Sequence, residues 1–149
     1  MKMKKAVLVL LGVCLLAFTS IARAEFKGGK WSITEVMKVD IPNMPPQYAA
    51  MNKGQTTTNT SCFVNQDDFV RIISKSYQGC QETHQANGDT VTFQSTCNNG
   101  NIQTTYNGNL TFNGNSMQGH MDGQQKYATG TNNYSYDITG QYLGPVSSC

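Results

Sequence analysis

The stretch from Cys80 to Gly114 reads CQETHQANGDTVTFQSTCNNGNIQTTYNGNLTFNG, and pairs of turn-forming residues divide it into short segments. Asn-Gly pairs between β-prone segments favour the tight turns of β-hairpins. Signals of this kind recur at Asn87-Gly88, Asn99-Gly100, Asn107-Gly108, Asn113-Gly114, Asp122-Gly123 and 130–133. The segments between them are about six to ten residues long, which predicts an antiparallel meander that is either an open curved sheet or a small barrel.

Alternation of apolar and polar residues extends this prediction to both ends of the chain. The last segment alternates most clearly, at Tyr134, Tyr136, Ile138, Gly140 and Tyr142. The first does so at Trp31, Ile33, Met37, Val39 and Ile41, with Glu35 on the same face. A period of two residues is typical of strands that bury one face. The prolines between 42 and 46 predict an irregular loop up to about Gln55, and 56–63 is β-prone again.

One short helix interrupts the strands. Asn65 can cap the first amides of a helix, and Asp67 and Asp68 fall in the first turn, where the helix dipole favours negative charge. Phe69, Ile72, Ile73 and Ser76 share one helical face. We expect Gly79 to end this helix. The fold class is therefore mainly β with one short α-helix.

The N-terminus has the pattern of an export signal. Lysines at 2, 4 and 5 precede an apolar run over 6–18, and Ala22-Arg23-Ala24 follows. This run is shorter than the roughly 20 residues of a membrane anchor. Cys14 is a poor lipidation site because Val13 is large where a small residue is expected. We therefore predict a signal peptide over 1–24, cleaved after Ala24, and a single domain over 25–149 in the periplasm.

Cleavage would change the charge of the protein. The formal net charge of the whole chain is +2, but four of its 11 basic residues lie in 1–24. The mature chain would keep 7 basic against 9 acidic residues, a net charge of −2. No cluster of Lys and Arg remains that could bind a run of phosphates. Nucleic acid and stable membrane insertion are thus not expected, and neither is a cofactor.

Four cysteines remain after cleavage, and they predict two disulfides in an oxidising compartment. A hairpin turn centred between Gly88 and Asp89 would place Cys80 opposite Cys97. Cys62 and Cys149 would then form the second bridge. A different turn register breaks this pairing, and four cysteines allow three connectivities.

Few residues have the chemistry of a catalytic or metal site. His84 falls on the face of Cys80, and His120 falls on the face opposite Met117 and Met121, which weakens a copper site made of these three. A nucleophile motif is absent from the sequence. Glu35 and Glu82 are the only carboxylates on otherwise apolar faces that glycoside hydrolysis could use. We therefore expect no enzyme.

Seven aromatic residues could line a cavity for an apolar or sugar-like ligand. They are Trp31, Phe93, Tyr106, Phe112, Tyr134, Tyr136 and Tyr142. Barrels of this size can hold one small molecule. The same residues can equally fill the core, which has few other large side chains, and this is the interpretation that we favour.

Several motifs together resemble one known family. They are Gly29-Lys30-Trp31-Ser32-Ile33-Thr34, Met44-Pro45-Pro46, Cys62-Phe63-Val64, Cys80 and Cys97 around a hairpin, and Leu143-Gly144-Pro145 with Cys149. In order and spacing they resemble the exported Gram-negative proteins of domain-of-unknown-function family 3617, over nearly all of 25–149. The resemblance implies an exported β-rich fold and no activity. Phe63-Val64-Asn65 and Ser147-Ser148-Cys149 depart from the usual pattern of that family.

These observations favour a non-enzymatic binding or envelope-interaction module that is a monomer. A carrier of a small apolar ligand and, less favoured, a copper-binding protein are the alternatives. A carrier predicts an empty volume lined by aromatic residues. An interaction module predicts a filled interior and an exposed strand edge. A copper protein predicts converging Met and His side chains.

Overall fold

The computed structural model describes residues 26–42, 45, 54–75, 79–147 and 149. The predicted signal peptide and most of the predicted loop before Gln55 lie outside the described residues. The described part holds seven strands and one helix: β1 (Gly29–Asp40), β2 (Gln55–Phe63), α1 (Gln66–Ile73), β3 (Cys80–Asn87), β4 (Thr90–Asn99), β5 (Ile102–Asn113), β6 (Ser116–Tyr127) and β7 (Gly130–Gly144).

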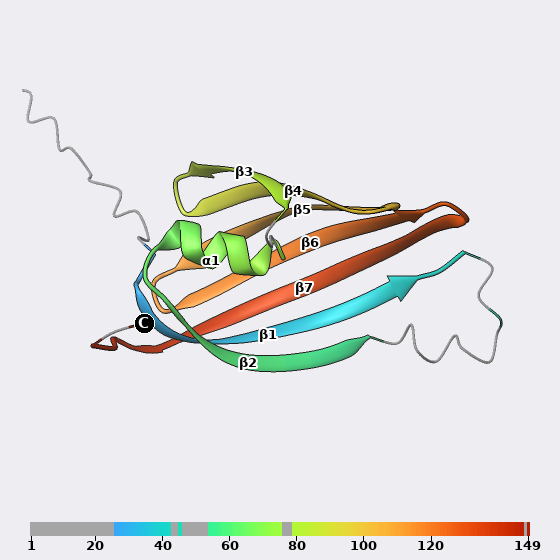
Figure 1. The fold of residues 1–149 in the computed structure, drawn as a ribbon. Coiled ribbons are helices and arrows are strands. Elements are labelled where there is room, and N and C mark those ends of the chain that lie inside the picture. Colours follow the sequence, from blue (N-terminus) through green and yellow to red (C-terminus); the bar gives the residue numbers. More distant parts are fainter. Residues whose placement is uncertain (1–25, 43–44, 46–53, 76–78, 148) are drawn as a thin grey trace, which may run out of the picture.

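All seven strands form one antiparallel sheet in the order β2-β1-β7-β6-β5-β4-β3 (Figure 1). The sheet is curved and open, so of the two predicted forms the chain adopts the open one. The strands β3 to β7 make the predicted meander, and β1 pairs with β7 at the end of it. Strands β2 and β3 are therefore the two edges.

The predicted hairpin register is confirmed. Cys80 pairs with Cys97, His84 with Phe93, and Ala86 with Val91. Both predicted disulfides are present, Cys80–Cys97 across this hairpin and Cys62–Cys149 between β2 and the C-terminal segment. The turn chemistry of 87–89 thus fixed the register that placed the first cysteine pair together.

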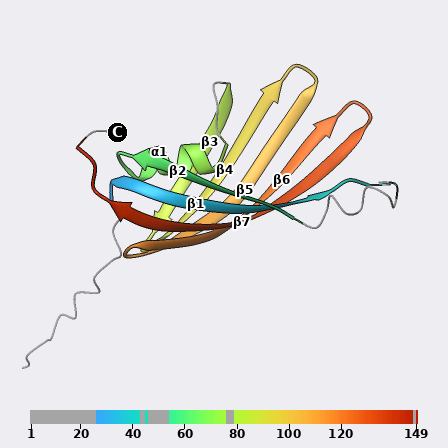
Figure 2. The ribbon, with the colours of Figure 1, turned by 90° about the horizontal axis from the view of Figure 1, so that it is seen from below.

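Helix α1 lies on one face of the sheet, which we call the inner face, and covers only part of it (Figure 1). The β4–β5 and β6–β7 hairpins extend away from the end where α1 and the C-terminus lie (Figure 2). The predicted cap is confirmed, since Asn65 accepts a hydrogen bond from the Asp68 amide at 2.9 Å. The helix ends at Ile73, however, and not near Gly79, because Lys75 adopts a left-handed φ of 57°.

The core lies between α1 and the inner face. Phe69 of the helix is fully buried, and its ring centroid lies 5.8 Å from that of Trp31, 5.6 Å from Phe112 and 4.5 Å from Phe63. The Trp31 indole donates to the Lys27 carbonyl oxygen at 2.9 Å. Its polar atom is therefore satisfied although the side chain is fully buried, as a stable core requires.

Two of the predicted turns are wrong. Asn107-Gly108 lies inside β5 and Asp122-Gly123 lies inside β6, so these strands are 12 residues long. Both glycines face inward, where a neighbouring ring lies over the backbone. A Cβ atom on Gly108 would lie 2.6 Å from Phe93, and one on Gly123 would lie 2.7 Å from Tyr106. These glycines make room for aromatic rings and do not reverse the chain.

The opposite, outer face of the sheet is polar. Its side chains are mostly Thr, Ser, Asn and Gln, as expected of an antiparallel sheet with one face in water. Among the described residues, no helix has the length and apolarity needed to cross a membrane.

Candidate functional site

The structure places the seven predicted lining aromatics on the inner face in two groups. Four of them are buried in the core: Trp31, Phe93, Phe112 and Tyr136. The others, Tyr106, Tyr134 and Tyr142, are partly buried and pack against that core. Helix α1 and Phe26 occupy the space above Trp31 and Phe112. This half of the inner face is filled by the protein's own side chains, which favours core packing over ligand lining there.

Polar contacts fasten the helix to edge strand β3. His84 Nε2 lies 3.1 Å from Asp67 Oδ1, and His84 Nδ1 lies 3.2 Å from Glu82 Oε1. The buried Ser74 hydroxyl donates to Glu82 Oε2 at 3.1 Å. Ser74 and His84 thus bind different oxygens of one carboxylate, and no hydrogen bond joins the hydroxyl to the ring. The histidine is not placed to activate this serine as a nucleophile.

A second polar contact fastens the helix to β1. Lys75 Nζ lies 2.8 Å from Glu35 Oε2, and it also lies 5.0 Å from the ring centroid of Tyr136. Glu35 and Glu82, the two candidate carboxylates, therefore each bind the segment 74–75. They stand on β1 and β3, which lie at opposite sides of the sheet order, and α1 lies between them on the inner face. Each carboxylate is thus engaged in holding the segment 74–75 against the sheet.

His120 lies among charged groups on the outer face. Its Nδ1 is 2.8 Å from Asp137 Oδ1 and its Nε2 is 3.3 Å from Asp122 Oδ1. The hydrogen bond to Asp137, together with the Asp122 charge, raises the pKa of His120 above its usual value. Hydrogen bonds from His120 and Lys38 lower the pKa of Asp137. This cluster is exposed, and the groups face one another across β1, β7 and β6.

The residues of the copper alternative do not converge. Met117 and Met121 are buried on the inner face, while His120 points outward. Among the described residues, His, Cys, Asp and Glu side chains form no group of three that could hold a metal ion.

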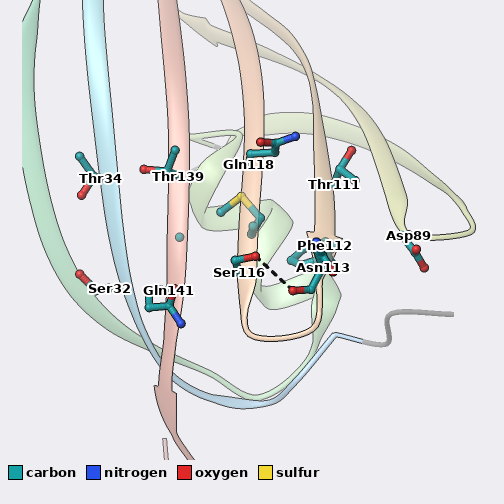
Figure 3. Close-up of a pocket in the computed structure, with 12 residues that line it drawn as sticks. Ser32, Thr34, Asp89, Thr111, Phe112, Asn113, Ser116, Gln118, Thr139 and Gln141 are labelled. Carbon is teal, nitrogen blue, oxygen red and sulfur yellow. Dashed lines mark hydrogen bonds between the residues drawn. The ribbon is translucent and has the colours of Figure 1, made fainter. Parts of the chain in front are cut away.

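A groove of about 750 Å³ lies on the outer face. Two polar rows cross it (Figure 3). They are Thr34, Thr139, Gln118 and Thr111, and Ser32, Gln141, Ser116 and Asn113. Asp89, at the β3–β4 turn, is the one charged residue among the described residues that line it. The groove offers neutral hydroxyl and amide groups. Some of these bind one another or the backbone, as Ser116 does by donating to the Asn113 carbonyl oxygen at 3.1 Å.

The two sheet edges differ in how they are protected. Edge strand β3 carries Glu82 and His84, which face inward and bind the helix. Inward-facing charges are one means by which proteins prevent unwanted strand pairing. Edge strand β2 reads QTTTNTSCF, so it has neither a charged residue nor a proline over its nine residues. Its first six residues are all exposed, including those that face inward.

Strand β2 therefore presents an open edge. In the part of the chain that the structure describes, only β1 pairs with it, from Met37↔Gln55 to Gly29↔Phe63. The Thr34 hydroxyl lies 2.9 Å from that of Thr58, so the upper polar row of Figure 3 continues onto β2. Sequence reasoning predicted this strand but could not tell that it forms an edge, because that depends on which strands pair.

The chain was compared with known proteins. A family model described as "Protein of unknown function (DUF3617)" matches residues 26–149. Neither the curated proteins nor the solved structures include a match to the chain.

Proposed function

The chain belongs to the DUF3617 family of proteins of unknown function, and we propose that it is a non-enzymatic interaction module that binds an extended segment of another protein along β2. In this mode the segment would add as an eighth strand, and main-chain hydrogen bonds would supply most of the affinity. The observation that carries the proposal is the open edge of β2, which is nine residues long, exposed over its first six residues, and free of charge and proline.

The packing of the interior supports this proposal over a carrier. Of the seven aromatic candidates, Trp31 and Phe112 are buried against Phe69 of α1. A small ligand would have to displace Phe69 and its neighbours from the core to reach them. The helix is also held on both sides, by Glu82 and Glu35, which opposes such an opening.

The composition of β2 suggests the kind of segment that it binds. Thr56, Thr58 and Thr60 face outward, while Thr57 and Asn59 face inward. Hydroxyl groups on both faces favour an uncharged, hydroxyl-rich or β-branched segment, because such pairs stabilise neighbouring strands. We place the interaction in the periplasm, since the sequence over 1–24 has the pattern of an export signal.

A pair of proline variants, Thr58→Pro and Asn59→Pro, tests the proposal. Neighbouring residues direct their amides to opposite sides of a strand, so one of these amides donates to β1 and the other faces the open edge. Proline at the residue whose amide faces the open edge removes no hydrogen bond of the sheet, but it blocks an added strand. We expect the variant whose lost amide faces the open edge to retain the wild-type melting temperature and to lose binding of the partner segment.

Binding would be followed with a photo-reactive amino acid at Thr56, which captures the partner segment, and then with a synthetic peptide of the captured sequence. Gln85→Pro and Ala86→Pro on β3 are matched controls at the opposite edge. If the folded β2 variant binds the peptide as well as wild type, or if only β3 prolines reduce binding, the proposal is wrong. Capture of a second copy of this chain would replace the partner by self-association, and would likewise overturn it.

A further inference from the structure

The inner face beyond the C-terminal end of α1 holds a second hollow, distinct from the β2 edge. It has a volume of about 440 Å³ and lies between Lys75 and the far ends of β4, β5 and β6. Thr104, Tyr106 and Gln125 line it from the sheet, and Asn98 lines it from the end of β4. We call this hollow the tyrosine trough. Its volume is within the range of small-molecule sites, about 300 to 1,000 Å³.

Gln125 is held in a fixed orientation beside this trough. Tyr134 donates a hydrogen bond to Gln125 Oε1 at 2.9 Å, and the Tyr127 hydroxyl donates to the same oxygen. Asn132 Nδ2 donates in turn to the Tyr127 hydroxyl at 3.0 Å. Both acceptor positions of the Gln125 side-chain oxygen are therefore occupied. Its amide nitrogen has no acceptor among the described residues, so it remains able to donate to a ligand.

Tyr106 is the aromatic residue that lines the trough among the described residues, and the buried Tyr136 packs against it. The ring centroids of Tyr106 and Tyr136 lie 6.4 Å apart, in an edge-to-face arrangement. Lys75 Nζ lies over the Tyr136 ring, but its charge is paired with Glu35. The described lining thus combines a partly exposed aromatic ring with neutral amide and hydroxyl groups, and its one charged residue, Lys75, is paired with Glu35.

From this combination we infer that the tyrosine trough binds a neutral, hydroxyl-rich ring, that is, a pyranose sugar. The C–H face of such a ring packs on an aromatic surface, while its hydroxyls bind amide and hydroxyl groups at the rim. An anionic ligand is not favoured, because Glu35 already neutralises Lys75. A purely apolar ligand is not favoured either, because it would cover the Gln125 amide without accepting a hydrogen bond from it.

The substitution Gln125→Glu tests this inference. A carboxylate still accepts the hydrogen bonds from Tyr127 and Tyr134, but it cannot donate to a sugar hydroxyl. Gln118→Glu is the matched control, since it makes the same change on the same strand but on the outer face. Maltose, cellobiose and di-N-acetylchitobiose serve as probes, and decanoate serves as the apolar comparison. Binding is followed by NMR titration, in which the side-chain NH₂ signal of Gln125 reports directly.

We expect at least one of these disaccharides to shift the Gln125 side-chain signal saturably. Gln125→Glu should weaken that binding by about tenfold, as loss of one ligand hydrogen bond does, while Gln118→Glu leaves it unchanged. Absence of saturable shifts with all three sugars would overturn the inference. Equal binding by the Gln125→Glu variant, or binding of decanoate in place of the sugars, would also overturn it. None of these outcomes bears on strand addition at β2.

Discussion

The ring of Phe93 on β4 lies directly over Gly108 on β5, its paired residue across the sheet. Phe93 is buried, and a Cβ atom on Gly108 would come within 2.6 Å of its Cζ and of the His120 carbonyl oxygen. The position therefore tolerates only hydrogen. Similar close approaches occur at Gly123 under Tyr106 and at Gly140 beside Met117. Large side chains of the inner face thus pack onto glycines of neighbouring strands.

The substitution Gly108→Ala should therefore destabilise the fold. The added methyl group must move both a buried ring and backbone atoms, and overpacking of this kind costs about 1–3 kcal/mol. Gly130→Ala is the control, because nothing lies within 4 Å of a Cβ atom there and Gly130 has no positive φ. Urea unfolding should show a clear loss for Gly108→Ala and a change within about 0.5 kcal/mol for Gly130→Ala. Equal losses would contradict this packing.

The two disulfides should contribute unequally to stability. On the chain-entropy model, Cys62–Cys149, with a sequence separation of 87, contributes more than Cys80–Cys97, with a separation of 17. Replacing both cysteines of a pair by serine should cost about 4–5 kcal/mol for the first and about 3 kcal/mol for the second. Unfolding of the two double variants under non-reducing conditions measures this order. A larger loss from removal of Cys80–Cys97 would show that the entropic account fails here.

Stability should depend on pH through His120. The fold raises the pKa of this residue, so its contribution is fully present below the unfolded value of 6.5 and is lost as pH rises through the folded pKa. The groups that face it are Asp137 on β7, Asp122 on its own strand, and Lys38 through Asp137. Wild type should lose stability relative to His120→Gln as pH rises above the unfolded value of 6.5, by about 1 kcal/mol or less because the cluster is exposed. Parallel pH profiles of the two proteins would refute this.

The pKa of Asp137 acts in the opposite direction. Because the fold lowers it, the contribution of this carboxylate is present above the unfolded value of 3.8 and is lost as pH falls through the folded pKa. Asp137→Asn should therefore flatten the acid side of the stability profile. Chemical unfolding between about pH 2 and pH 5 measures this change. An acid limb that is equally steep in Asp137→Asn would mean that other carboxylates determine it.

Export can be tested separately from the fold. We predict that the mature chain begins at Glu25, because cleavage follows Ala24. Intact mass spectrometry of the protein purified from the periplasmic fraction measures this start. A chain that retains residues 1–24, or one that carries a lipid at Cys14, would contradict the predicted signal peptide.

Local chemistry explains which parts of the fold could be predicted. The turn at 87–89 fixes a register, and that register brings Cys80 and Cys97 together. The cap at Asn65 depends only on neighbouring residues and was also predicted correctly. Gly108 and Gly123 were misassigned because an Asn-Gly or Asp-Gly pair in mid-strand looks the same as one in a turn. The alternation of inward-facing residues distinguishes the two cases. It continues through Tyr106, Gly108 and Leu110 without a break, whereas a turn would interrupt it.

Long-range pairing explains the rest. The Lys75–Glu35 ion pair joins residues 40 positions apart, and no local sequence pattern predicts it. The left-handed turn at Lys75 ends the helix early, so the predicted end at Gly79 failed. In the same way, alternation predicts that 56–63 is a strand but not that it lies at an open edge. The sequence predicts which aromatic residues face inward, but only the position of α1 shows which of them it covers, and only Tyr106 of the seven lines the trough in the described structure.

Hydrogen–deuterium exchange along β2 tests the central claim most directly. If the β2 edge is open, the amides of Thr56 to Ser61 that face away from β1 should exchange rapidly in the free protein, while those that donate to β1 exchange slowly. Addition of the captured partner peptide should then slow exchange of the β2 amides that face away from β1, and exchange of the β3 amides should not change. If the β2 amides that face away from β1 already exchange slowly in the free protein, the edge is covered, and strand addition is contradicted.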